Sequence, residues 1–257
     1  MPADDTHQIE APHWRRAGSF LLAVAFLAGV LTFAFSTTMY RWNWASVWGY
    51  RALFVRGWLV TVVLSAISLI ISCLIGVIFA LLRRTPILPL RYLARIYVET
   101  IRGTPLLVQL LIFYFVVAPA FGVRDLYVVG VLTLSAFSGA YISEVIRSGI
   151  ESVGQSQLDS ARAIGLSTVQ TYRYVIFPQA IRQILPPLAG QFASLIKDSS
   201  LLSVIGTGEF ALSGQNVMSY TYSNFESCLL LAVGYLLLTL PISLWTQSLE
   251  RRNRFET

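Results

Sequence analysis

The residues that could do chemistry in this chain are charged side chains within apolar segments. Lys197 and Asp198 interrupt one such segment, and Glu144 lies near the end of another with Arg147 three residues later. Charges inside a membrane are costly and usually face the protein interior or a cavity. If a helix begins near Pro186, Lys197 and Asp198 are 11 and 12 residues into it, about 17 Å from its start. They line a path for a charged ligand or tie helices together, or Lys197 extends to the membrane surface.

Glu144 and Arg147 are spaced to form an ion pair on one helix face. The spacing favours this structural pairing over a proton relay.

Other catalytic chemistry has little support. The two histidines, His7 and His13, lie in the N-terminal tail, which excludes a histidine-based triad or metal cage within the membrane. Cys73 and Cys228 both lie in apolar runs and are expected to be buried packing residues rather than a disulfide or a metal site. The sequence has no GxxxxGK[ST] motif and no GxGxxG after a strand. We expect no catalytic or nucleotide site, no metal and no bound cofactor.

Composition identifies the class of protein. The chain has 257 residues, of which 55% are hydrophobic and 12% charged, about half the charged share of a soluble domain. Crossing a bilayer takes about 20 helical residues, and six stretches have roughly this length with almost no charge. They are Ala17–Tyr40, Gly57–Leu82, Gly103–Val123, Leu126–Ser143, Ile184–Gly208 and Ser227–Leu249. The sequence therefore predicts an all-α, polytopic membrane protein with about six transmembrane helices.

The basic residues predict the orientation. When the six segments alternate across the membrane, 15 of the 19 lysines and arginines fall on one side, which the positive-inside rule makes cytoplasmic. Both termini are then cytoplasmic, and the net charge of +6 needs no nucleic acid to explain it. Arg15 and Arg16, the apolar run and Ala34–Ser36 are also compatible with a signal peptide.

Four regions are expected along the chain. Residues 1–16 form a cytoplasmic tail, and residues 17–56 an extra N-terminal transmembrane helix with an outer-face interfacial segment rich in Trp and Tyr. Residues 57–250 form the main membrane domain, which contains a polar segment at 154–187. Residues 251–257 form a second cytoplasmic tail.

The polar segment is expected to form two short helices in the cytoplasm. Gly165 ends the first, Gln157–Ile164, and Ser167 caps the second, Thr168–Phe177, which Pro178 ends. The first helix is expected to expose three small residues that allow close approach by another surface: Ser160, Ala161 and Ala163. An ordinary solvated loop fits the same residues equally well.

The pattern D-S-A-x-A-I-G, with V-x-F-P nine residues further on, resembles the EAA loop of ATP-binding cassette (ABC) importer permeases. Asp159 takes the position of the Glu, Ser160 and Ala161 those of the two alanines, and Gly165 and Pro178 those of the Gly and the Pro. Asp is one methylene shorter than Glu, so the contact that the family's Glu makes through its carboxylate is the least certain property to carry over to Asp159.

Three further segments resemble the polar amino acid subfamily of these permeases, which serves histidine, glutamine and arginine. They are "YVETIRGTPLLVQLLIFY", "AYISEVIRSGIESV" and "LIKDSSLLSVIG". The resemblance implies a type I importer permease fold in a bacterial inner membrane, with a cytoplasmic coupling helix. It also implies two ATPase subunits that bind ATP and Mg, a second permease, identical or homologous, and an extracytoplasmic amino-acid-binding protein, besides membrane lipid.

The resemblance also implies two groups of site residues. The ATPase-coupling group is Asp159, Ser160, Ala161, Ala163, Gly165 and Pro178. The candidates for the substrate path are Lys197, Asp198, Arg102, Thr104 and Glu144; an amino acid would present its ammonium to Asp198 and its carboxylate to Lys197. Gly103 and Pro105 are also explained as a simple helix entry. An ion-coupled secondary transporter is the alternative, with Glu144 or Asp198 as the coupling acid.

Overall fold

The computed structural model describes residues 13–37 and 40–253, and these contain helices and turns but no strand. The chain divides into two compact units, residues 1–43 and 44–257. The first unit contains helix α1, His13–Thr37, with exposed apolar side chains such as Leu22 and Phe26. Residues 13–16, expected in a tail, belong to this helix, while residues 1–12 and 254–257 of the two expected tails lie outside the described part.

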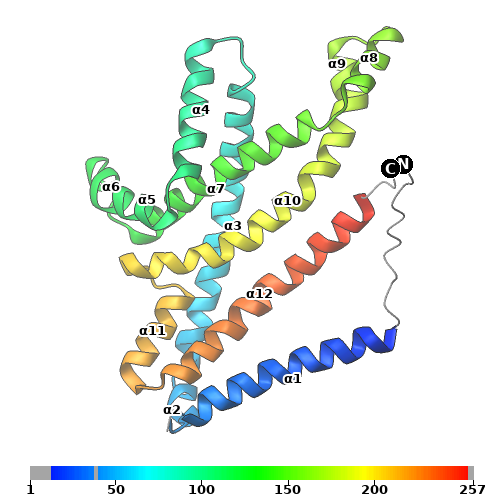
Figure 1. Cartoon of the computed structure of the whole chain (residues 1–257). Coiled ribbons are helices and arrows are strands. Elements are labelled where there is room, and N and C mark those ends of the chain that lie inside the picture. Colours follow the sequence, from blue (N-terminus) through cyan, green and yellow to red (C-terminus); the bar gives the residue numbers. More distant parts are fainter. Residues whose placement is uncertain (1–12, 38–39, 254–257) are drawn as a thin grey trace. The chain divides into compact units, whose positions relative to one another are not determined.

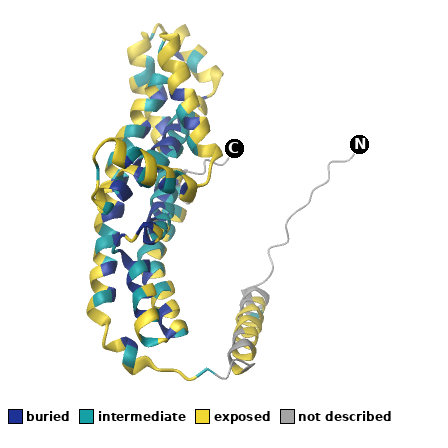
Figure 2. Ribbon diagram, turned by 90° about the vertical axis from the view of Figure 1, so that its left-hand side faces the viewer, coloured by how far each residue is buried: buried dark blue, intermediate teal, exposed yellow. Residues whose placement is uncertain are grey.

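Three long helices form the centre of the second unit: α3, Arg51–Leu82; α7, Leu126–Glu151; and α10, Phe177–Asp198. Helix α7 packs along α3 and also against α10, and α12, Asn224–Asn253, packs on α10 (Figure 1). In Figure 2 the buried residues of this unit follow the lines along which its helices face one another.

Small residues allow α3 and α7 to approach closely. A Cβ atom on Gly76 would lie 2.5 Å from Ile142 of α7, and one on Gly139 would lie 2.5 Å from Ile75 of α3. Ser135 Oγ of α7 donates to the Ser68 carbonyl of α3 at 3.3 Å. Serines are buried along both helices: Ser65, Ser68, Ser72, Ser135, Ser138 and Ser143. Close packing of small residues is the usual way in which helices associate in a membrane, where the hydrophobic effect gives them no preference for each other.

The third predicted segment, Gly103–Val123, is the second arm of a bent helix pair rather than a span of its own. Helix α4, Leu88–Gly103, and the apolar piece Leu106–Ala120 meet at an angle of 113°. That piece consists of α5, Leu106–Ile112; a π turn η1, Phe113–Val117; and α6, Ala118–Ala120. Most of the stretch between the second and third predicted spans is therefore the amphipathic helix α4.

Among the described helices, three are long and apolar enough to cross a membrane: Arg51–Leu82, Leu126–Glu151 and Asn224–Leu249. The bent pair would make a fourth. The predicted span Ile184–Gly208 is instead divided between α10, which begins at Phe177, and a 3₁₀ helix η3, Ser199–Ile205, which ends at Gly206 with φ +83°.

Two short helices complete the unit. Helix α11, Phe210–Thr221, was not predicted, because its sequence mixes polar and apolar residues. Helix α2, Trp44–Trp48, lies in the segment rich in Trp and Tyr that was predicted to be interfacial. The next helix begins at Arg51, not at Gly57. A Cβ atom on Gly57 would lie 2.2 Å from Ser213 of α11, so this glycine permits a close helix contact.

Candidate functional site

The polar segment folds into a helical block, residues 155–176, made of α8, α9 and η2. Helix α8 spans Gln155–Ala163, α9 spans Thr168–Thr171 and the π turn η2 spans Tyr172–Ile176. Gly165 has φ +77°, and its N–H donates to the Arg162 carbonyl at 3.0 Å. Glycine adopts this left-handed conformation without strain. The predicted break between two short helices is thus present.

Ser167 caps the second helix, as predicted. Its Oγ accepts from the Gln170 N–H at 3.4 Å, and Gln170 Oε1 accepts from the Ser167 N–H at 2.8 Å, which is a capping box. The prediction that Pro178 ends this helix is wrong. Pro178 lies in the first turn of α10, and the backbone stays helical from Thr168 to Asp198 through η2 (Figure 1). Since proline has no N–H to donate, a wider turn just before it relieves the helix.

The small residues of α8 do not share one exposed face. Ala161 is buried, with 3% of its surface exposed, whereas Ser160 and Ala163 are exposed. The expectation that Ala161 is exposed is therefore wrong, because its side chain packs within this chain. Asp159 is exposed, accepts from Gln155 Nε2 at 3.0 Å and pairs with Arg162 at 3.2 Å, so its carboxylate already has local partners.

The turn of the helical block carries an apolar tip that the sequence analysis missed. Ile164 and Val169 flank the Gly165 turn and are 77% and 75% exposed. Their exposure contrasts with the buried base of the block, where Val153, Ile176 and Ala180 pack together. Paired apolar residues around a glycine turn are the sequence signal that could have revealed this tip. Exposed apolar side chains on an otherwise polar block are typical of a docking surface.

A cluster of three arginines surrounds Glu144. The predicted pair with Arg147 is present, with Nε 3.1 Å from both carboxylate oxygens. Nη1 of Arg83, the C-cap residue of α3, lies 2.5 Å from Glu144 Oε2, and Arg102 Nη1 of α4 lies 3.7 Å from it. Arg102 also lies over the ring of Tyr141, 5.5 Å from its centroid. The carboxylate therefore ties the ends of α3 and α4 to α7, and brings two substrate-path candidates, Arg102 and Glu144, together.

Thr104 lies at the break between α4 and α5, where one side chain holds the bend. Gln109 Nε2 donates to Thr104 Oγ1 at 2.8 Å, to the Thr104 carbonyl at 3.0 Å and to the Ile101 carbonyl at 2.7 Å. The last turn of α4 has carbonyls without helical partners, and Gln109 satisfies two of the carbonyls at this break. Pro105 is the N-cap residue of α5, as a helix entry requires, whereas Gly103 is the last residue of α4 and so ends the preceding helix.

Lys197 and Asp198 are the last two residues of α10. The helix begins at Phe177 and runs through Pro186 and Pro187. The predicted helix start near Pro186, from which the position of the two charges in the membrane was derived, is therefore wrong. Lys197 is exposed and Asp198 is half-buried. Within the part of the chain that the structure describes, neither side chain forms a hydrogen bond or an ion pair. Both charges are therefore available to a ligand or to another chain.

Glu209 is a buried acid that sequence reasoning missed. It caps α11 by accepting from the Ala211 and Leu212 N–H groups, each at 2.8 Å. Tyr235 of α12 donates to it at 3.0 Å, and Thr61 of α3 at 3.3 Å. The carboxylate thus joins three helices. An acid directly before a helix start was the available signal. Of the cysteines, Cys73 is half-buried and Cys228 exposed, so burial was a wrong expectation for Cys228.

Residues 72–255 match the family of binding-protein-dependent transport system inner membrane components. The chain belongs to this family. It is similar to the probable glutamine ABC transporter permease GlnM of Bacillus subtilis, with 37% identity over 78% of this chain and 93% of that protein. It is also similar to the glutamine transport system permease GlnP of Escherichia coli K12, with 35% identity over 82% of this chain and 98% of that protein.

Solved structures show the same relationship. A structure described as an amino acid ABC transporter with histidines superposes with a TM-score of 0.78 at 37% identity, over 83% of this chain and all of that one. The MetNI methionine ABC transporter in an inward-facing conformation shares the fold, with a TM-score of 0.64 at 18% identity over 80% of this chain and 98% of that one. The predicted fold and the predicted function of an ABC permease subunit in the inner membrane are confirmed, and the comparisons give no support to a secondary transporter.

Proposed function

We propose that this permease carries polar amino acids inward across the membrane, driven by ATP hydrolysis in partner subunits. Glutamine is the first candidate substrate, because the relatives named above are glutamine permeases that align over nearly their whole length. The chain works with a second permease, identical or homologous, and an extracytoplasmic binding protein delivers the amino acid. Two ATPase subunits bind ATP and Mg, and this chain binds no cofactor of its own.

The observation that carries the coupling proposal is the exposed tip of the helical block. Ile164 and Val169 project from a block whose base is packed between the end of α7 and the start of α10. A partner that grips this tip would move both helices together, because η2 continues into α10 without a break. Rigid-body movement of packed helices is a common way to transmit a conformational change.

The roles of the predicted coupling residues follow from their positions. Gly165 shapes the turn that presents the tip, and Pro178 sets the junction between the block and α10. Asp159, Ser160 and Ala163 lie on the exposed surface of the block and border the docking surface. Ala161 supports the block from inside.

The substrate path is proposed to pass the end of α10. An amino acid in its zwitterionic form offers an ammonium to Asp198 and a carboxylate to Lys197, and these two groups have no competing partner in the described chain. Thr104 lies at the broken α4–α5 junction, where irregular backbone suits a cavity in a membrane protein. Arg102 and Glu144 are proposed to flank the path and to hold its walls together.

The proposed topology follows the distribution of basic residues. Both termini and the helical block face the cytoplasm, α1 is an extra membrane helix, the segment that contains α2 is interfacial, and the permease domain runs from α3 to α12. The polar segment 154–187 carries the helical block.

Co-purification with the ATPase tests the coupling proposal. We expect the double variant Ile164→Asp and Val169→Asp to lose the ATPase in detergent, because two charges would then enter an apolar contact. Ile87→Asp is the matched control, since Ile87 is also an exposed apolar residue, 54% exposed, next to a turn. Retention of the ATPase by the double variant, or equal loss in the control, would overturn the proposal.

A further inference from the structure

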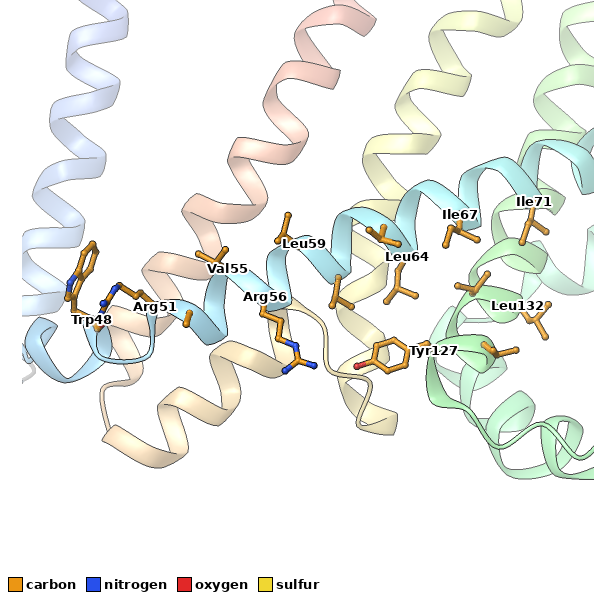
Figure 3. Close-up of a pocket in the computed structure, with 15 residues that line it drawn as sticks. Trp48, Arg51, Val55, Arg56, Leu59, Leu64, Ile67, Ile71, Tyr127 and Leu132 are labelled. Carbon is orange, nitrogen blue, oxygen red and sulfur yellow. Dashed lines mark hydrogen bonds between the residues drawn. The ribbon is translucent and has the colours of Figure 1, made fainter.

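A long apolar groove runs between α3 and the start of α7 (Figure 3). Its volume is about 1300 Å³, above the roughly 300–1,000 Å³ of typical small-molecule pockets. Leu59, Val63, Ile67 and Ile71 line it along α3, and Leu132 of α7 lines the other wall. Its lining includes two charged residues, Arg51 and Arg56, both in the first two turns of α3.

The two arginines have capacity to bind an anion. Arg56 is exposed and forms no hydrogen bond or ion pair with any described residue. Arg51 donates to the Trp48 carbonyl at 3.2 Å and lies over the Trp48 ring, 5.8 Å from its centroid. A guanidinium has five N–H donors, so most donors of this pair are unused. In Figure 3 Arg56 extends from α3 toward Tyr127, while Arg51 lies beside Trp48 at the start of the helix, so each arginine has an aromatic neighbour.

We propose that this groove binds an anionic phospholipid, with its phosphate at Arg56, with Arg51 adding positive charge near the headgroup, and with one acyl chain along α3. Trp and Tyr rings favour the membrane surface, and Trp48 and Tyr127 both line the groove beside the two arginines. Arginine pairs with phosphate through charge-assisted, often bidentate hydrogen bonds. The groove is thus positively charged where a lipid headgroup would lie and apolar where its acyl chain would lie.

The length of the groove matches one leaflet. From Arg56 to Ile67 there are 11 residues, which span about 16 Å at 1.5 Å per residue. This is close to half of the ~30 Å hydrocarbon core of a bilayer. An acyl chain that begins beside Arg56 would therefore reach the middle of the membrane near Ile67, where the apolar lining continues only to Ile71.

A second copy of the chain fits this groove less well. None of the residues that line it is acidic, and Asp125, close by in sequence, is engaged as the N-cap of α7 through the Val128 N–H at 3.0 Å. In a two-fold symmetric contact centred here, the arginines of both copies would face each other. Burying unpaired like charges against an apolar wall is unfavourable, whereas a phosphate neutralises them.

Native mass spectrometry of the purified complex, released from nanodiscs of phosphatidylglycerol and phosphatidylcholine, tests the proposal. We expect the wild type to retain phosphatidylglycerol selectively, and the double variant Arg51→Gln and Arg56→Gln to retain about tenfold less. Arg124→Gln is the matched control, because Arg124 lies just before α7 but does not line the groove, and it should retain lipid like the wild type. Leu59→Trp, which fills the groove one helical turn beyond Arg56 and keeps both arginines, should also lose the lipid.

The outcomes separate the possible occupants. Equal retention by the wild type and the double variant, or no preference for phosphatidylglycerol over phosphatidylcholine, would overturn the proposal. Efficient disulfide cross-linking between two copies that carry Val63→Cys would also overturn it, because the groove would then be an interface between permeases. If the double variant fails to insert, Leu59→Trp decides alone: unchanged lipid retention in that variant refutes the site.

Discussion

Replacing Gly165 tests the turn that presents the docking tip. Its φ of +77° lies in the left-handed region, which costs a residue with a Cβ about 1–2 kcal/mol. A Cβ at this position would meet no atom within 4 Å, so the cost is one of backbone conformation rather than of a clash. Such a cost shifts a conformational equilibrium by roughly 5- to 30-fold. We expect Gly165→Val, which is β-branched, to reduce transport and substrate-stimulated ATP hydrolysis by at least this factor while the protein stays inserted.

Two controls separate the turn from general instability. Gly122 also has a positive φ, +71°, and open space at its Cβ, but it lies in the turn after α6, so Gly122→Val should keep ATPase association. Gly165→Asn should retain most activity, since Asn enters the left-handed region more readily than other residues. The assays are substrate uptake, ATPase activity and ATPase retention in the reconstituted complex. Two results would refute the reasoning. One is wild-type transport and ATP hydrolysis in Gly165→Val. The other is loss of the bound ATPase in Gly122→Val.

Three other substitutions test separate parts of the structure. Asp198→Asn should weaken substrate recognition by about 10- to 100-fold, since a hydrogen bond to a charged group contributes about 1.5–3 kcal/mol. The variant should also change substrate preference in competition uptake, while assembly and basal ATPase activity persist. Unchanged uptake and selectivity would remove Asp198 from the path. Ala161→Arg should expose the helical block to limited proteolysis, because overpacking a buried site costs about 1–3 kcal/mol; an unaltered digestion pattern would contradict the burial of this residue. Glu209→Ala should destabilise the protein by about 2–4 kcal/mol through loss of a helix cap and of two side-chain contacts, which thermal unfolding in detergent would measure. A change of less than 1 °C in the unfolding midpoint would show that the carboxylate does not join the three helices.

The sequence predicted the parts of the fold that depend on local rules. The Gly165 turn and the Ser167 cap follow from conformational preference and from a side chain that hydrogen-bonds its own helix start, and the structure has both. The pair of Glu144 and Arg147 follows from helical spacing. The apolar segments indicated helices in a membrane, because their length and lack of charge reflect the thickness of the bilayer core.

Features that depend on contacts distant in sequence were not predictable in this way. The bend between α4 and α5 is held by Gln109, whose three acceptors are known only from the folded backbone. Pro178 does not stop a helix, because the π turn before it removes the conflict. Ala161 is small and in a polar segment, yet it is buried. Glu209 directly follows the predicted apolar segment Ile184–Gly208, where a charged residue is expected in solvent, yet it is buried between α3, α11 and α12.

The energy source of transport is the most direct test of the account. The permease would be reconstituted in liposomes with its ATPase and binding protein, and uptake of radiolabelled glutamine would be measured with ATP on the ATPase side. We predict uptake that requires ATP, persists when the proton gradient is collapsed, and is lost in the double variant Ile164→Asp and Val169→Asp. Uptake that follows a proton gradient without ATP, or that is unaffected by the double variant, would contradict the account.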